Sequence, residues 1–106
     1  MTDLADRQCV LGATKLADDA VASILVELGN SWQVTDGRLH KTFSFPDFVT
    51  ALAYVNKIGE LAEAQNHHPD IELSWGKVSL SIWTHDAGGL TNNDFIWCAK
   101  AERLNA

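Results

Sequence analysis

The sequence predicts an α+β fold: a single two-layer domain in which a four-stranded, largely antiparallel sheet carries helices on one face. Two pairs of short segments alternate apolar and polar residues, and three segments repeat apolar residues at helical spacing. A sheet with one apolar face needs helices to cover it. The length of 106 residues and the 46% apolar content suit one hydrophobic core. We therefore expect one domain over residues 1–106, in the order α-ββ-α-ββ-α, with a loosely ordered segment at residues 1–13.

The first helix and the first hairpin are expected in the N-terminal half. Residues 18–28 carry apolar side chains at helical spacing, have acids in the first turn and precede Gly29, a typical helix stop. Residues 32–35 and 38–44 flank Asp36-Gly37, a pair typical of the type I′ turn because both of its central positions need positive φ. The sequence therefore predicts a helix followed by a tight hairpin.

The longest predicted helix follows this hairpin. Pro46 suits its first turn, and helical periodicity continues to about Gln65. The main apolar stripe consists of Phe48, Ala51, Leu52, Val55, Ile58 and Ala62. Tyr54, Leu61 and Ala64 lie outside this stripe. Because exposed apolar surface often marks an interface, this helix is the candidate surface for self-association or for a protein partner.

A second hairpin and a final helix complete the predicted fold. Residues 71–75 and 78–82 alternate apolar and polar side chains on either side of Gly76, which provides the turn. The segment Thr91–Asp94 is typical of a helix start, and helical periodicity then continues to Leu104. An antiparallel hairpin returns its second strand to the level where its first began. The chain before the third strand and the chain after the fourth are therefore expected to meet.

Composition and charge exclude several classes of function. The net charge is −6 and the basic residues are scattered singly, so the chain lacks the positive stripe that nucleic acid requires. The N-terminus has no basic region leading into an apolar run, and no segment is long enough to span a membrane. Cys9 and Cys98 are too few and too far apart for a disulfide framework. We expect a cytoplasmic protein that does not bind nucleic acid directly.

The chemically distinctive side chains gather where the elements of the second half end. Glu63, His67 and His68 lie at the end of the long helix and in the loop that follows it. His85 follows the fourth strand, and Asp94 lies at the start of the last helix. Histidine ordinarily titrates near neutral pH, and carboxylates can orient it. These five side chains therefore predict an acid–base site at one end of the sheet.

Each of these residues also has an alternative explanation. His68 could cap the helix end, Asp94 could belong to a capping box, and Glu63 could be a solvated helix-end residue. The same set could hold Zn²⁺ or Fe²⁺, although neighbouring histidines such as His67 and His68 seldom point at one metal ion. No Ser or Cys lies in a motif that would activate it as a nucleophile.

An ordered set of short motifs runs through the second half of the chain. The motifs are Glu63-x-x-x-His67-His68-Pro69, an aromatic residue at Trp75, Val78, Thr84-His85 and Gly89-Leu90-Thr91-x-x-Asp94. Together they resemble the pterin-4a-carbinolamine dehydratases. Further similarity upstream involves Trp32, the turn at Gly37, Phe43 and Phe48, so that the resemblance covers about residues 14–104. One departure is Trp75, where the family more often has Tyr.

The resemblance implies a reaction and the residues that perform it. Members of this family dehydrate 4a-hydroxytetrahydropterin to quinonoid dihydropterin in the recycling of the tetrahydrobiopterin cofactor, without a metal or an organic cofactor. By similarity, His67 and His85 are the acid and base candidates, in an order that the sequence does not encode. His68 would position the substrate or assist, and Glu63 and Asp94 would orient the imidazoles.

The resemblance also implies binding segments and partners. Substrate is expected against His67-His68-Pro69 and Thr84-His85-Asp86-Ala87, and Trp32 matches an aromatic residue near the family's site. Family members are homodimers or homotetramers. Animal members also act as dimerisation cofactors of a homeodomain transcription factor, through a helical surface. A binding-only relative should have lost site residues, whereas this chain retains all of them, so the sequence favours an enzyme and leaves an interaction protein as the alternative.

Overall fold

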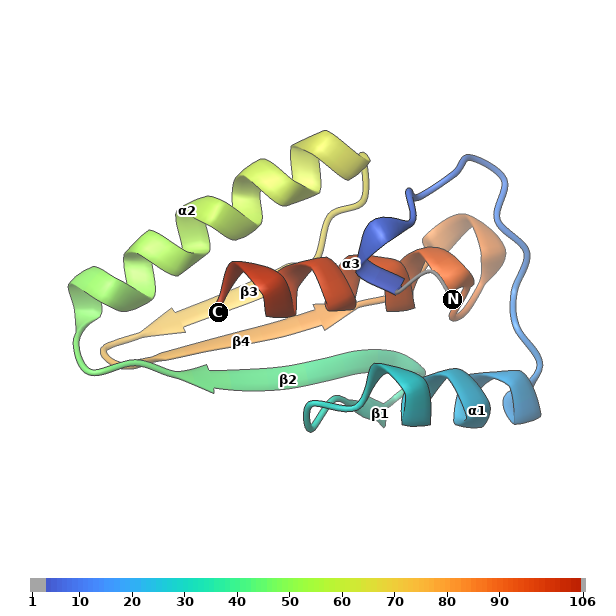
Figure 1. Cartoon of the computed structure of the whole chain (residues 1–106), viewed down its shortest axis with the longest axis horizontal. Coiled ribbons are helices and arrows are strands. Elements are labelled where there is room, and N and C mark those ends of the chain that lie inside the picture. Colours follow the sequence, from blue (N-terminus) through green and yellow to red (C-terminus); the bar gives the residue numbers. More distant parts are fainter. Residues whose placement is uncertain (1–3, 106) are drawn as a thin grey trace.

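The computed structural model describes residues 4–105, and its elements follow the predicted order (Figure 1). The elements are η1 (Leu4–Asp6), α1 (Asp18–Leu28), β1 (Gln33–Thr35), β2 (Arg38–Ser44), α2 (Phe48–Gln65), β3 (Asp70–Ser74), β4 (Lys77–Ile82), η2 (His85–Ala87) and α3 (Asn92–Leu104), where η denotes a short 3₁₀ helix. The predicted α+β class and the order α-ββ-α-ββ-α are confirmed. Within the described chain, no helix combines the length and the apolar character that a membrane crossing needs.

The strands form one antiparallel sheet in the order β1-β2-β4-β3, so the two hairpins meet along β2 and β4. Leu39 pairs with Ile82 and Phe43 pairs with Val78. Paired residues of antiparallel strands share a face, so the apolar side chains of both central strands point to the same side. All three α helices cover that side (Figure 1). The fully buried core between the layers includes Leu39, Val78, Leu80, Ile82, Ala51, Ile58, Phe95 and Trp97.

The opposite face of the sheet is polar. Its central strands carry paired hydroxyl side chains, with Thr42 and Ser79 in hydrogen-bond contact at 2.8 Å. His40 also lies on this face, 2.9 Å from the hydroxyl of Ser81. The sheet therefore separates His40 from the helical layer.

The helix ends agree with the sequence except at the start of α2. Asp36 and Gly37 have φ angles of 53° and 73°, as the predicted type I′ hairpin requires. The prediction that Pro46 lies in the first helical turn is wrong, because Asp47 is the N-cap and its carboxylate accepts the Thr50 N–H at 2.8 Å. Tyr54, expected outside the apolar stripe, is buried and donates its hydroxyl to the Ala101 carbonyl at 2.9 Å.

The N-terminal segment makes specific contacts where the sequence predicts a loose segment. Of that segment, residues 1–3 lie outside the described residues. Leu4 and Ala5 are buried, and the Lys100 ammonium donates to the Ala5 carbonyl at 2.8 Å. The chain then follows the edge of the helical layer to α1 (Figure 1). Residues 4–6 are therefore attached to α3.

Candidate active site

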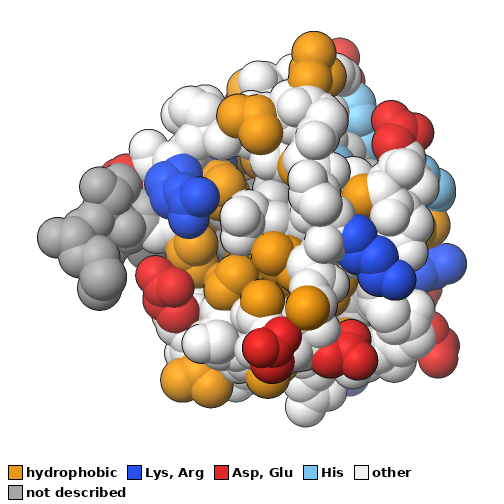
Figure 2. Space-filling view, turned by 90° about the vertical axis from the view of Figure 1, so that its right-hand side faces the viewer, with side chains coloured by type: hydrophobic (Ala, Val, Ile, Leu, Met, Phe, Trp, Pro, Cys, Tyr) orange, Lys and Arg blue, Asp and Glu red, His pale blue; other side chains and the backbone are white. Residues whose placement is uncertain are grey.

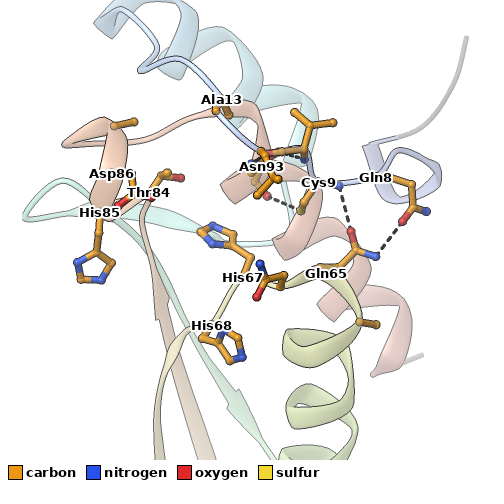
Figure 3. Close-up of a pocket in the computed structure, with 16 residues that line it drawn as sticks. Gln8, Cys9, Ala13, Gln65, His67, His68, Thr84, His85, Asp86 and Asn93 are labelled. Atoms are coloured by element: carbon orange, nitrogen blue, oxygen red, sulfur yellow. Dashed lines mark hydrogen bonds between the residues drawn. The ribbon is translucent and has the colours of Figure 1, made fainter.

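A pocket of about 770 Å³ lies at the end of the sheet where the predicted site residues meet. Three chain segments line it together with Asn93: residues 8–13, residues 64–68 and residues 84–87. Figure 2 shows this end of the molecule, with histidine side chains along one margin and hydrophobic side chains gathered near the centre. Figure 3 shows His67, His68 and His85 around the pocket, contributed by the loop after α2 and by η2.

The end of α2 directs the chain into this pocket. Asn66 adopts the left-handed conformation, with φ 50° and ψ 44°, which is a common way for a helix to stop. The His67 N–H then donates to the Ala62 carbonyl at 3.1 Å and so satisfies a carbonyl of the last turn. The two neighbouring histidines therefore leave the helix in a fixed direction.

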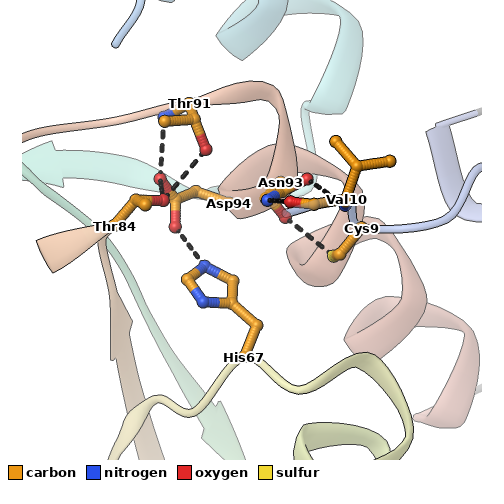
Figure 4. A network of polar contacts seen from close by, with 7 residues as sticks. All are labelled: Cys9, Val10, His67, Thr84, Thr91, Asn93 and Asp94. Atoms are coloured by element: carbon orange, nitrogen blue, oxygen red, sulfur yellow. Dashed lines mark hydrogen bonds and ion pairs between the residues drawn. The ribbon is translucent and has the colours of Figure 1, made fainter. Parts of the chain in front are cut away.

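A buried carboxylate holds the first histidine (Figure 4). His67 donates from Nε2 to Oδ1 of Asp94 at 2.6 Å, and the Asp94 side chain is 0% exposed. The other carboxylate oxygen accepts the Thr84 hydroxyl at 2.9 Å and the Thr91 N–H at 2.8 Å. Asp94 thus completes the capping box of α3 and bonds His67 at the same time. Because each acceptor oxygen has a donor, the carboxylate and the imidazole are held in one arrangement.

The second histidine has an exposed partner. His68 donates from Nε2 to Oε2 of Glu63 at 2.5 Å. The side chains are 55% and 79% exposed, respectively, so water surrounds this ion pair. Glu63 lies in the last turn of α2, where a carboxylate opposes the helix dipole and benefits from a cationic or donor partner.

An aromatic ring supports the third histidine. The His85 imidazole lies 4.1 Å from the Trp83 indole, centroid to centroid, at an interplanar angle of 39°. The Arg38 guanidinium carbon lies 3.7 Å from the centroid of the same indole. Within residues 4–105, no hydrogen bond to the His85 ring is present, so the indole is the group that orients this exposed imidazole.

Four residues of the predicted site do not line this pocket: Trp32, Pro69, Glu63 and Asp94. Trp32 is 4% exposed, packs edge-on against Phe43 at 5.9 Å and donates its indole N–H to Glu102 at 2.9 Å. It is therefore a core residue, because the side chain at the start of the first hairpin points between the layers. Pro69 is also absent from the lining residues of the pocket. His67, His68, Thr84, His85, Asp86 and Ala87 do line it, and Glu63 and Asp94 bond the histidines from outside.

The structure adds a segment that the sequence did not indicate. Cys9 and its neighbours form one side of the pocket although no motif marks residues 8–13. Burial raises the pKa of the Cys9 thiol to about 11, and burial also holds the pKa of Cys98 well above its usual range. Both thiols are therefore protonated at neutral pH, which agrees with the expectation that neither is a nucleophile.

The alternative of a metal site lacks a ligand set in the part of the chain described. Among residues 4–105, no three His, Cys, Asp or Glu side chains converge closely enough to hold a metal ion. His67 and His68 each use Nε2 to bond a different carboxylate, so the two neighbouring imidazoles are engaged in separate contacts.

The fold and the site together define a class of small α+β domains with a histidine-lined pocket at the end of an antiparallel sheet. The chain belongs to the family described as pterin 4 alpha carbinolamine dehydratase, whose family model matches residues 14–104. A relative from Rickettsia canadensis (strain McKiel) is 44% identical over 96% of this chain and 97% of its own length. Another, from Chlorobium limicola (strain DSM 245 / NBRC 103803 / 6330), is 46% identical over 92% of this chain and 88% of its own. Both carry pterin-4-alpha-carbinolamine dehydratase as a provisional name.

Solved structures share the fold. A transcriptional coactivator/pterin dehydratase from Brucella melitensis superposes with a TM-score of 0.82 at 25% identity, covering 88% of this chain and 100% of that one. A pterin dehydratase-like protein identified as a RuBisCO assembly factor in the alpha-carboxysome has a TM-score of 0.62 at 20% identity, covering 73% of this chain and 92% of that one. The second likeness concerns the fold alone.

Proposed function

We propose that this protein dehydrates 4a-hydroxytetrahydropterin to quinonoid dihydropterin by histidine acid–base catalysis, in cytoplasmic recycling of a pterin cofactor. Family membership supports the substrate class. The observation that carries the mechanism is the shared pocket of His67, His68 and His85, in which a buried carboxylate fixes His67. The proposal needs no metal and no organic cofactor.

The reaction requires two proton transfers and no redox step. The C4a–O bond breaks and the hydroxyl leaves as water once an acid has protonated it. The N5–H bond loses its proton to a base, and its electron pair forms the C4a=N5 double bond. Imidazole can take either part near neutral pH, as an imidazolium acid or as a neutral base.

We assign the two transfers to His67 and His85. Nε2 of His67 is hydrogen-bonded to Asp94, so Nδ1 is the nitrogen left for proton transfer. When this ring carries a proton, the buried carboxylate compensates its positive charge. His85 is exposed and can exchange its proton with water between turnovers. We assign His68, whose partner Glu63 is exposed, to positioning the substrate.

The rate acceleration that this reaction requires is modest. A carbinolamine already loses water without a catalyst, and positioned acid–base groups typically accelerate a reaction by about 10²–10⁴-fold. An open, preassembled pocket that orients two imidazoles is sufficient for an acceleration of this size.

Rapid mixing of chemically generated 4a-hydroxytetrahydropterin with metal-free protein tests the proposal. Because each imidazole supplies one proton transfer, His67→Ala and His85→Ala should each lower the rate by about 10–10²-fold, and the double variant should approach the uncatalysed rate. The wild-type rate should fall at low pH as the base becomes protonated and at high pH as the acid is lost.

His40→Ala is the matched control, because His40 lies on the opposite face of the sheet and does not line the pocket. It should retain the wild-type rate. Near-wild-type turnover in the double variant would contradict the assignment. Stoichiometric metal in active protein, with activity that a chelator abolishes, would favour the metal alternative.

A second candidate role, protein interaction through α2, is favoured by its exposed apolar side chains. Val49 is 75% exposed and Leu52 is 40% exposed, and Trp75, in the turn after β3, is 71% exposed. Homodimer or homotetramer formation is the simpler use of this surface. A partner retained in a pull-down after replacement of all three pocket histidines, but lost in Val49→Asp, would support the second role.

A further inference from the structure

One wall of the pocket lies outside the region that defines the family. The family model matches residues 14–104, which include all three pocket histidines and Asp94. Residues 8–13, by contrast, precede the matched region and still form one side of the pocket. The groups that perform the reaction and this wall are therefore separate parts of the site.

Two side-chain amides attach the wall to the helical layer. Asn93 accepts the Val10 N–H at 3.0 Å and donates its amide to the Val10 carbonyl at 2.7 Å, so it pairs with both backbone groups of one residue (Figure 4). Gln65 accepts the Cys9 N–H at 3.0 Å (Figure 3). Asn93 is 7% exposed, and a buried amide that lost these partners would be left unsatisfied.

Both ends of the wall are also fixed. Upstream, η1 is buried against α3 and Lys100 bonds the Ala5 carbonyl. Downstream, the Leu16 N–H donates to the Leu90 carbonyl at 2.8 Å. Between these points Gly12 has φ +70°, a conformation that residues with a side chain rarely adopt, which allows the chain to turn beside the pocket. The wall is therefore held at defined points along the pocket.

The wall offers a ligand mainly apolar contacts. The backbone N–H groups of Cys9 and Val10 are already paired, whereas the side chains of Val10 and Leu11 are 61% and 91% exposed. In the view of Figure 3, Cys9 and His85 lie on opposite sides of His67. The reacting atoms C4a and N5 must lie beside the histidines, so this wall is available to a part of the substrate that does not react.

We propose that residues 8–13 select the substituent at C6 of the pterin, and that Asn93 is the positioning residue that holds this wall. The inference rests on the proposed dehydration. The pyrimidine edge of a pterin carries donors and acceptors that need polar partners, whereas the carbon atoms of the C6 substituent suit exposed apolar side chains such as Val10 and Leu11. Contacts to a non-reacting group change kcat/KM between substrates that differ in that group.

The test compares two substrates, the 4a-hydroxy derivatives of a tetrahydropterin with a dihydroxypropyl group at C6 and of one with a methyl group there. Asn93→Ala should raise KM for the first by about tenfold and change kcat by less than about twofold, because two hydrogen bonds to the wall are lost. Asn92→Ala, a matched change one residue away that does not touch the pocket, should match wild type.

A second variant covers the case in which Asn93→Ala unfolds. Leu11→Ser alters an exposed side chain and should shift the ratio of kcat/KM between the two substrates by about threefold or more, without changing Tm. Amide hydrogen exchange gives a readout independent of turnover. A 7,8-dihydropterin with the longer side chain should slow exchange at residues 8–13 in wild type.

The outcomes separate the two proposals. If wild-type protein binds this dihydropterin with protection at residues 8–13 but shows no turnover, the proposed dehydration fails and the wall remains a ligand contact. If wild type turns over while Leu11→Ser leaves the substrate ratio unchanged, or the pterin gives no protection at residues 8–13, the inference about the wall is overturned.

Discussion

His67 and His68 are neighbours in the chain, and each donates from Nε2 to a carboxylate, at 2.6 Å to Asp94 and at 2.5 Å to Glu63. Their surroundings differ: the first pair is 14% and 0% exposed, and the second is 55% and 79% exposed. Water and salt screen an exposed pair, whereas a buried carboxylate left without its donors destabilises the fold. Contact distance therefore does not distinguish the two pairs, whereas burial and the additional donors to Asp94 do.

The largest effect is expected from the buried partner. Asp94→Asn keeps the shape of the side chain but presents an amide nitrogen to one of three groups that now donate to the carboxylate. We expect kcat to fall by about 10–10²-fold, as in His67→Ala, because the His67 ring loses its fixed orientation, and the cost to stability comes in addition. The free energy of unfolding should fall by about 2–4 kcal/mol. Single-turnover kinetics and urea unfolding measure the two quantities.

The next largest effects on the rate are expected from replacing the two histidines themselves. His67→Ala should lower kcat by about 10–10²-fold, whereas His68→Ala should lower it by less than about tenfold and act mainly on KM. The difference follows from the proton-transfer role that we propose for His67 and the positioning role that we propose for His68. Steady-state kinetics on both variants at one pH measure this difference. Equal losses of kcat would contradict the expectation that the buried pair matters more than the exposed one.

The third histidine provides an intermediate case, because Trp83 orients it without a hydrogen bond. Trp83→Ala should reduce kcat by about three- to tenfold, since a stacked ring restrains the imidazole by about 0.5–1.5 kcal/mol. Trp83→Phe should restore most of the rate because a flat ring remains. If the phenylalanine variant is as slow as the alanine variant, stacking is not what orients His85.

The smallest effect is expected at the exposed carboxylate. Glu63→Gln should change kcat by less than about twofold, because water already screens its pair with His68. The wild-type rate should likewise vary little between low and moderate salt. A loss in Glu63→Gln as large as that in Asp94→Asn would break the comparison on which these expectations depend.

Much of the fold could be predicted because its signals are local. The helix Asp18–Leu28 was predicted with its observed ends, since periodicity and the following Gly29 define both. Residues 71–75 were expected to alternate as one strand, but β3 ends at Ser74 and Trp75 is 71% exposed in the turn. Alternation of residues cannot distinguish the last residue of a strand from the first residue of a turn.

The convergence of the candidate site residues was predictable to the same extent. The histidines and carboxylates form a motif that is visible in the sequence, and hairpin geometry brings its parts together. Trp32 was misplaced because an aromatic side chain at a strand start fits either a core or a cleft. The wall at residues 8–13 was missed since its anchors, Gln65 and Asn93, are 56 and 83 positions away from the residues that they bond. No local pattern encodes such contacts.

The double role of Asp94 has an evolutionary consequence. The same carboxylate caps α3 and bonds His67, so selection for folding alone is enough to retain it. The histidine side chains cap no helix, and two other donors to Asp94, the Thr84 hydroxyl and the Thr91 N–H, remain when His67 is replaced. In a descendant that kept the fold but abandoned the chemistry, His67 and His85 would drift while Asp94 persisted. Under the proposed function, an aspartate at this position is therefore expected wherever the fold is kept, whereas the histidines are expected only where the chemistry is kept as well.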